Sequence, residues 1–257
     1  MAKAAIDARI ELFLSELRLP SIKKNYVKIA KEVGQSGSDY AGFLHALLEE
    51  EVNDRCTRRI ERRLQEARFP QIKELADLDE TSLPSGISMP QLWELAKGDY
   101  IKDGANIIAV GSSGTGKTHV SIGLGVEACR QSRRVRFYTA TELVSELAAA
   151  QEQNALHRFL KRLATIDLLI VDELGYLPVT EQGAELLFQA FSARHERGSV
   201  IVNSNLPFSE WAQVFKTERL AVAMLDRVTH RANILEMNGE SFRLRSAKGR
   251  KAQNKPG

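Results

Sequence analysis

The sequence is poor in cysteine, tryptophan and proline, with two, two and seven of them among 257 residues. Two cysteines cannot build a disulfide-stapled scaffold, and neither they nor the five histidines show metal-ligand spacing. Cys56 and Cys129 lie in helical patterns, so we expect reduced thiols in or near the core. The sequence has no secretory signal and no run of about 18 apolar residues, which predicts a cytoplasmic protein without a membrane segment.

Charge of one sign is not in large excess, because the formal net charge of +3 is too small to indicate a partner. The distribution of charge is more informative, since arginines cluster at 55–68 and cations recur at 243–255. Guanidinium groups on one helix could contact nucleic-acid phosphates. A solvated helix face with internal pairs to Glu61 and Glu66 explains the cluster equally well. The candidate DNA-contacting residues are Arg58, Arg59, Arg62 and Arg63.

The stretch IIAVGSSGTGKT, residues 107–118, joins a short apolar run to a glycine-rich turn and the start of a helix. It fits the phosphate-binding pattern G-x-x-x-x-G-K-[ST], in which glycines let backbone N–H groups converge on an anion. Lys117 can reach the β- and γ-phosphates of a nucleotide, and the Thr118 hydroxyl suits Mg²⁺. The alternative, a glycine–serine turn that happens to carry a lysine, does not explain the flanking strand and helix. The predicted nucleotide-binding residues are Gly111, Ser112, Ser113, Gly114, Thr115, Gly116, Lys117, Thr118 and His119.

Helical periodicity predicts a small all-α domain at residues 1–69. Its predicted helices cover 4–17, 21–33 and 39–68. Residues 70–98 form the next segment, in which 71–87 is predicted to be an extended, weakly structured connector. The sequence SMPQ then has capping-box spacing with proline in the first turn, which predicts a helix over 88–96.

Residues 99–245 alternate short apolar runs with helical segments, which is the pattern of a parallel α/β sheet. The predicted strands cover 107–110, 135–139, 167–172, 199–203 and 233–237. The predicted helices cover 117–130, 141–163 with a break near 152–155, 180–196, 208–216 and 219–231. A hairpin signal, MNGE, would pair the last strand with 241–245. The tail, 246–257, is basic and is predicted to be disordered.

Two carboxylates follow a buried strand, LLIVDE, at the sheet edge where open α/β sheets bind ligands. In a phosphate-loop protein Asp172 is placed to hold Mg²⁺, and Glu173 could polarise a water for attack on the γ-phosphate. Acids that only cap a strand end are the alternative. The next strand ends at the same edge in NSNLP, where an amide could orient the attacking water. We choose Asn205 over Asn203, although a turn-forming asparagine before Leu-Pro is also compatible.

A helix after this strand carries Arg227 in the sequence LDR, with Arg219 and Arg231 on either side. One of these arginines could reach the nucleotide of a neighbouring subunit as an arginine finger, and we choose Arg227. A surface helix with Asp–Arg pairs is the alternative.

Several segments together closely resemble the IstB-like helper ATPases of bacterial insertion-sequence transposition. That family is similar to the DnaC-type helicase loaders within the AAA+ ATPases. The resemblance covers nearly the whole chain, although GSS replaces the commoner GPP or GPT in the phosphate loop and 71–90 matches only loosely. The segments that carry it are LRLP at 17–20, ARFP at 67–70, GSSGTGKTH at 111–119, LLIVDELGYLP at 168–178, SNLPFSEW at 204–211, MLDRVTHR at 224–231 and MNGESFRLR at 237–245.

The resemblance implies an AAA+ P-loop NTPase fold, in which helices flank a parallel sheet and a small all-α domain precedes it. Only about 50 residues follow Asn205, too few for a full lid domain. The implied function is that of a Mg-ATP-dependent ATPase that oligomerises on double-stranded DNA and assists a cognate transposase in target selection and insertion. A replicative helicase loader is the alternative, but DELGYLP and LRLP favour the first. A metabolic phosphotransferase would need an acceptor pocket and lid arginines, which are not recognisable.

Overall fold

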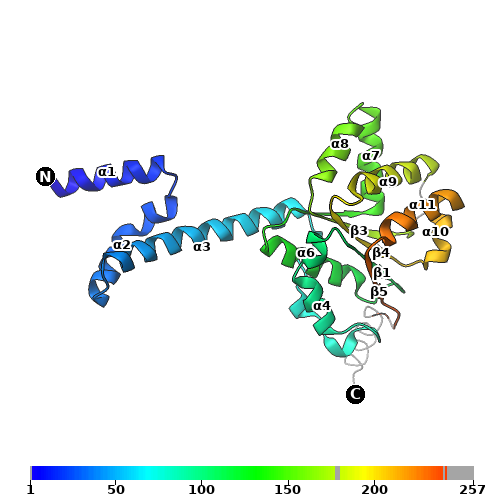
Figure 1. Ribbon diagram of the computed structural model, residues 1–257, viewed down its shortest axis with the longest axis horizontal. Helices are drawn as coiled ribbons and strands as arrows, with labels where there is room; N and C mark the ends of the chain where they lie inside the picture. Colours follow the sequence, from blue (N-terminus) through cyan, green and yellow to red (C-terminus); the bar gives the residue numbers. More distant parts are fainter. Residues whose placement is uncertain (1, 177–179, 240, 242–257) are drawn as a thin grey trace, which may run out of the picture. The chain divides into compact units, whose positions relative to one another are not determined.

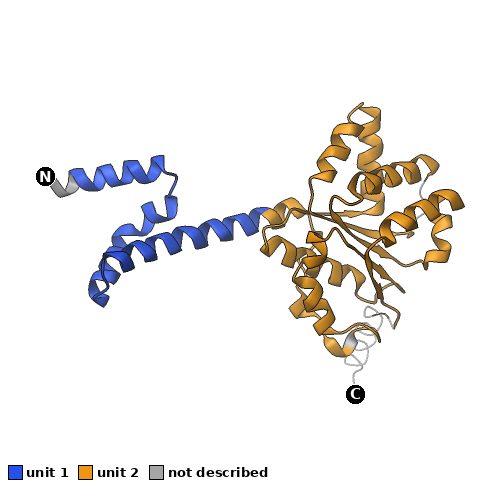
Figure 2. Ribbon diagram, viewed as in Figure 1, with its two compact units in different colours: residues 1–62 blue, residues 63–257 orange. Residues whose placement is uncertain are grey.

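The computed structural model describes residues 2–176, 180–239 and 241 of the chain. It divides into two compact units, Met1–Arg62 and Arg63–Gly257 (Figure 2). No helix in the described part of the chain is long and apolar enough to cross a membrane.

Three helices account for the described residues of the first unit. They are α1 (Ala2–Glu16), α2 (Pro20–Ser36) and α3 (Tyr40–Ala67), whose last residues belong to the second unit (Figure 1). The start of α2 is held by the buried carboxylate of Glu51, which accepts hydrogen bonds from the backbone of Ser21 and Ile22 at 2.9 and 3.2 Å. Burial raises the pKa of Glu51, but hydrogen bonds from Arg55 and these two amides outweigh that effect and lower it. Glu51 therefore caps α2 as an anion at neutral pH.

The apolar stripe of α3 is only partly buried within this unit. Leu47 is 8% exposed, whereas Tyr40 and Val52 are 94% and 63% exposed. Cys56 is exposed too, so the prediction of a near-core thiol is wrong for Cys56 and confirmed for the buried Cys129. Periodicity identifies the apolar side of a helix, but it does not say whether a single chain supplies the surface that covers it.

The second unit is built on a five-stranded parallel sheet with the order β2-β3-β4-β1-β5. Its strands are β1 (Asn106–Val110), β2 (Val135–Thr139), β3 (Leu168–Leu174), β4 (Ser199–Ser204) and β5 (Ala232–Glu236). The five predicted strands are thus confirmed, and β3 runs on to Leu174 through a register shift beside β4. The predicted partner strand at 241–245 lies almost wholly outside the described residues.

Helices cover both faces of the sheet, and two hydrophobic clusters fill the space beneath them (Figure 1). Along β3 the side chains of Leu169 and Val171 belong to one cluster and that of Ile170 to the other, as the period of a strand requires. The first face carries α7 (Ala140–Glu152), α8 (Leu156–Ala164), α9 (Glu181–Arg194), α10 (Trp211–Phe215) and α11 (Glu218–Thr229). The second face carries α4 (Met89–Ala96), α5 (Asp99–Lys102) and α6 (Lys117–Arg130). The expected break between α7 and α8 is confirmed.

The segment after α3 is more ordered than the prediction of an extended connector for 71–87. It contains the short helices η1 (Leu75–Asp77) and η2 (Glu80–Ser82). Leu75 is fully buried in the cluster beneath α6, where its side chain fills the space in which Gly123 would carry a Cβ. The prediction was wrong because single turns of 3₁₀ helix are too short to produce a periodic apolar pattern.

Candidate nucleotide-binding site

The predicted phosphate loop joins the end of β1 to the start of α6. Gly111, Gly114 and Gly116 have φ values of 153°, 83° and 97°, a region that side-chain-bearing residues rarely adopt. Gly116 directly precedes the first turn of α6, so the backbone N–H groups of that turn face the loop. The sequence therefore builds an anion-binding turn where the motif predicted one.

Two of these glycines are required by close neighbours that the sequence analysis missed. A Cβ on Gly111 would lie 2.1 Å from the carbonyl oxygen of Met237, and one on Gly114 would lie 2.2 Å from Oγ of Ser241. The backbone N–H of Met237 also donates to Val110 O at 2.7 Å. The chain that leaves β5 thus packs directly against the phosphate loop.

Lys117 is buried at the start of α6. Its Nζ donates to the carbonyl oxygens of Gly111 and Ser112 at 2.5 and 2.7 Å. Burial lowers the pKa of Lys117, and the negative charge of Asp172 opposes that shift. A polyphosphate would place further anionic oxygens beside this buried ammonium group, in exchange for its two carbonyl contacts.

Asp172 lies at the centre of a hydrogen-bond network at the carboxyl ends of the strands. Its Oδ2 accepts from Oγ1 of Thr118 and its Oδ1 from Nδ2 of Asn203, both at 2.9 Å. Oδ1 of Asn203 in turn accepts from Oγ of Ser121 at 2.7 Å. A hydroxyl and a carboxylate at this distance are hard oxygen donors of the kind that Mg²⁺ prefers, so the residues present fit that ion.

Glu173 and Asn205 lie beside this network and are both exposed. Glu173 has a φ of 60°, and its carbonyl accepts from the N–H of Tyr176 at 3.1 Å, so the chain turns sharply where β3 loses register with β4. The two consecutive carboxylates therefore have different surroundings: Asp172 is buried, whereas Glu173 faces solvent. Asn203, the amide that we ranked second, orients Asp172, whereas the water-orienting role of Asn205 stays a prediction.

These side chains line one cavity of about 370 Å³ in the second unit. It brings together most of the predicted site, while Gly111, Ser112 and Thr115 lie outside its lining. Four residues of the segment after α3 complete its wall, and no sequence motif indicated them. Tyr176, from the DELGYLP segment, lines it too. The lining residues are Lys73, Asp77, Leu78, Asp79, Ser113, Gly114, Gly116, Lys117, Thr118, His119, Asp172, Glu173, Tyr176, Asn203 and Asn205.

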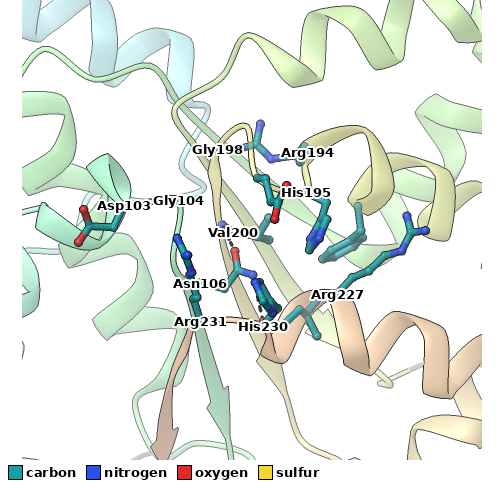
Figure 3. A pocket seen from close by; sticks show the side chains of 13 residues that line it. Asp103, Gly104, Asn106, Arg194, His195, Gly198, Val200, Arg227, His230 and Arg231 are labelled. Atoms are coloured by element: carbon teal, nitrogen blue, oxygen red, sulfur yellow. Dashed lines mark hydrogen bonds between the residues drawn. The ribbon is translucent and has the colours of Figure 1, made fainter.

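Arg227 lies elsewhere. It lines a second cavity of about 120 Å³ near the amino ends of β1, β4 and β5, together with Arg194 and Arg231 (Figure 3). Its guanidinium carbon stacks 4.4 Å from the ring centroid of Phe188. Arg219 is exposed on the first turn of α11. None of the described residues that line the nucleotide cavity is an arginine, so one chain brings Lys117 and Glu173 together without an arginine finger.

The four candidate DNA-contacting arginines are not equivalent. Arg58 donates to Oγ of Ser21 at 2.6 Å and to Asp54 at 3.0 Å. Arg63 donates to the carbonyl of Ser132 at 3.2 Å and to Glu66 at 2.7 Å. Both side chains therefore hold local structure, whereas Arg59 is exposed to solvent. Contact of these arginines with DNA stays a prediction.

The fold is of the AAA+ P-loop type, and the site has the features of a nucleotide-binding site. Residues 13–250 match the family of IstB-like ATP binding proteins, and the chain belongs to that family. A putative insertion-sequence ATP-binding protein of Sinorhizobium fredii is 38% identical over 94% of this chain and 81% of its own length. Another from Pseudomonas aeruginosa is 36% identical over 92% and 89%. A crystal structure of the DnaC helicase loader aligns with a TM-score of 0.51 at 17% identity, over 64% of this chain and 96% of that one.

The contact between the phosphate loop and Met237 predicts that Gly111→Ala is far more harmful than an ordinary glycine substitution. We expect a loss of roughly 2–4 kcal/mol in the free energy of unfolding, since backbone strain and steric overlap add. Gly86 is the matched control, because it has a φ of 100° and, its chain neighbours aside, no heavy atom of the described residues lies within 4 Å of the position that its Cβ would take. Gly86→Ala should cost only roughly 1–2 kcal/mol. Equal losses in urea denaturation would contradict the close packing of Met237.

Proposed function

We propose that this chain is a Mg-ATP-dependent ATPase that oligomerises on double-stranded DNA and assists a transposase in target selection and insertion. The observation that supports hydrolysis most directly is the Thr118–Asp172–Asn203 network beside an exposed Glu173. The names of the relatives, insertion-sequence ATP-binding proteins, support the transposition role. A family match over residues 13–250 favours this role over helicase loading, because the DnaC likeness at 17% identity concerns the fold alone.

In this proposal the triphosphate lies on the loop and the first turn of α6, with Lys117 donating to its β- and γ-phosphates. Thr118 and Asp172 would hold Mg²⁺, which supplies charge neutralisation at the transferring phosphoryl group. Glu173 takes a proton from the attacking water as the water oxygen bonds to the γ-phosphorus. The bond from that phosphorus to the bridging oxygen breaks, and ADP and phosphate are the products. Asn205 orients the water, and Asn203 keeps Asp172 in place.

Removing the proposed base should separate binding from hydrolysis. Glu173→Gln keeps the size of the side chain but cannot accept the proton, so we expect turnover to fall by roughly a hundredfold or more while ATP still binds. Lys117→Ala is the contrasting variant, since it loses charged hydrogen bonds to the phosphates and should weaken ATP binding at least about tenfold. Steady-state turnover and calorimetric titration with ATP measure the two effects. Full turnover by Glu173→Gln would remove Glu173 from the chemistry.

Arg227 and Glu173 line different cavities of one chain, so we expect Arg227 to act on the nucleotide bound by a neighbouring chain. We expect Arg227→Ala to retain ATP binding and to lose on the order of 10³-fold in turnover. A mixture of Arg227→Ala and Glu173→Gln chains should regain activity, because a mixed interface pairs an intact Glu173 with an intact Arg227. Activity of the parent should also rise more than linearly with its concentration. Arg219→Ala, on the first turn of α11, is the matched control. It should keep most of the parent's turnover, so mixing it with Glu173→Gln chains should produce no gain in activity.

DNA affinity should fall steeply with salt, with a slope of about −0.9 per phosphate contact in a plot of log affinity against log salt. Because Arg58 and Arg63 hold local structure, the variant to test is Arg59→Ala. It should weaken binding across sequences and reduce the slope by about 1. Arg158→Ala, on the exposed side of α8, removes the same charge elsewhere. If only the α8 variant changes the slope in fluorescence anisotropy titrations, Arg59 does not bind DNA.

A further inference from the structure

Arg227 is held by an aromatic ring rather than by an anion. Its guanidinium carbon lies 4.4 Å from the ring centroid of Phe188, a residue of α9, and the side chain extends from α11 toward that helix (Figure 3). Within the described part of the chain, the guanidinium of Arg227 takes part in no salt bridge and no hydrogen bond. The described carboxylates and carbonyls therefore leave its N–H donors unused.

Arg194, which lines the same cavity, is held in the opposite way. Its guanidinium is buried and donates to backbone carbonyls near the end of α8, just before β3 and at the start of β4. Both terminal nitrogens are used in these contacts, so Arg194 fastens α9 to the sheet. Of the two arginines, Arg227 is the one whose donors are available to a ligand. The acceptors of Arg194 are the carbonyl oxygens of Leu163, Ile166, Asp167 and Ser199.

The contact between Arg227 and Phe188 also differs from the other arginine–aromatic contacts among the described residues. In each of the others the two residues are close neighbours in one helix or strand, so the contact follows from local geometry. Phe188 and Arg227 lie on different helices, and their distance is the shortest in the group. The local pairs are Arg9 with Phe13, Arg136 with Tyr138 and Arg162 with Phe159.

The backbone beside Arg227 is fixed by hydrogen bonds to the sheet. The carbonyl of Val228 accepts from Nδ2 of Asn106 at 3.0 Å, and Oδ1 of Asn106 accepts from the backbone N–H of Val200 at 2.9 Å. Asn106 is buried and is the first residue of β1, so the end of α11 is joined to β1 and β4. Phe188 packs against the hydrophobic cluster that α9 and α11 share. The backbone that carries Arg227 and the ring beneath its guanidinium therefore belong to one packed layer.

An arginine that acts on the nucleotide of another chain has to meet two opposing requirements. A carboxylate partner in its own chain would compete with the phosphate, whereas a side chain without any contact would lose rotamer freedom on reaching the phosphate. A ring beneath the flat guanidinium meets both requirements. The cation–π attraction acts through the face of the group and leaves the N–H bonds at its edge free to donate. Phe188 thus orders Arg227 without pairing it.

We propose that Phe188 is a positioning residue for hydrolysis, which holds Arg227 stacked and unpaired so that the guanidinium can donate to the γ-phosphate bound by a neighbouring chain. This inference rests on the proposed function, in which Arg227 acts in trans. Phe188 itself touches no substrate. Its removal should therefore weaken the chain that donates the arginine and leave ATP binding in the cavity of the same chain unchanged.

The first test compares two substitutions of Phe188 in the full-length chain. Phe188→Leu keeps an apolar side chain on α9 but removes the ring, and we expect turnover to fall by roughly tenfold. Phe188→Tyr keeps the ring and should stay within about twofold of the parent's turnover. Both variants should bind ATP as the parent does in calorimetric titration. Phe159→Leu is the matched control, because it removes a ring of the same hydrophobic cluster from beneath a different arginine and should leave turnover near that of the parent.

Mixtures of variants show which side of the interface needs Phe188. Phe188→Leu mixed with Glu173→Gln should exceed the mean of the two separate turnovers, because the first chain supplies an intact Glu173 and the second a correctly held Arg227. Phe188→Leu mixed with Arg227→Ala should show no such gain, since neither chain supplies a correctly held Arg227. A variant that had only lost stability would not regain activity from Glu173→Gln chains.

Three results would overturn the inference alone, provided that Arg227→Ala has lost its turnover. They are full turnover in Phe188→Leu, an equal loss in Phe188→Leu and Phe188→Tyr or Phe159→Leu, and no gain when Phe188→Leu is mixed with Glu173→Gln. Full turnover in Arg227→Ala would instead overturn the trans-acting role of Arg227, and with it the part of the proposed function on which the inference rests.

Discussion

The arrangement of the site depends on one buried carboxylate, Asp172, and the two hydrogen bonds that hold it. Thr118 comes from the first turn of α6, Asp172 from β3 and Asn203 from β4, so the contacts at 2.9 Å join three elements that are far apart in the sequence. A buried carboxylate without such partners would be costly, because desolvation penalises its charged form. The same contacts that stabilise the charge therefore fix the lateral positions of the helix and the strands at the edge where a ligand would bind.

A parallel sheet makes this convergence possible. Every strand of a parallel sheet points the same way, so side chains at the carboxyl ends of β1, β3 and β4 meet at one edge. The order β3-β4-β1 puts the strand that carries Asn203 between the phosphate loop and Asp172. Asn203 can then contact both Ser121 on α6 and Asp172. Its amide is a positioning group, which differs from the water-orienting role assigned to the exposed Asn205.

The sequence predicted those parts of the fold that leave a local signal. Buried strands produce continuous apolar runs, and the phosphate loop needs glycines at fixed spacing, so both could be recognised along the chain. The approach of Met237 and Ser241 to the loop could not be predicted, because it joins residues about 126 positions apart by packing alone. The segment Lys73–Asp79 was missed for a different reason, since its one turn of 3₁₀ helix, η1, is too short to produce a periodic pattern. For Cys56, the helix was predicted correctly but the burial of the thiol was not, since burial depends on what covers that side of the helix.

The positions of the two cavities restrict how copies of the chain could share a site. Glu173 lies at the carboxyl ends of the strands, and Arg227 lines a cavity near their amino ends. An assembly in which Arg227 of one copy completes the Glu173 site of the next must join two different surfaces. If that contact repeats head to tail, it generates a ring when the rotation closes and a helical filament when it does not. In either case each nucleotide lies between two chains, so the end copy of an open filament would have a site without its arginine. Under the proposed function, turnover per chain would then rise with the number of copies in an open filament, because a smaller share of the sites lies at its end.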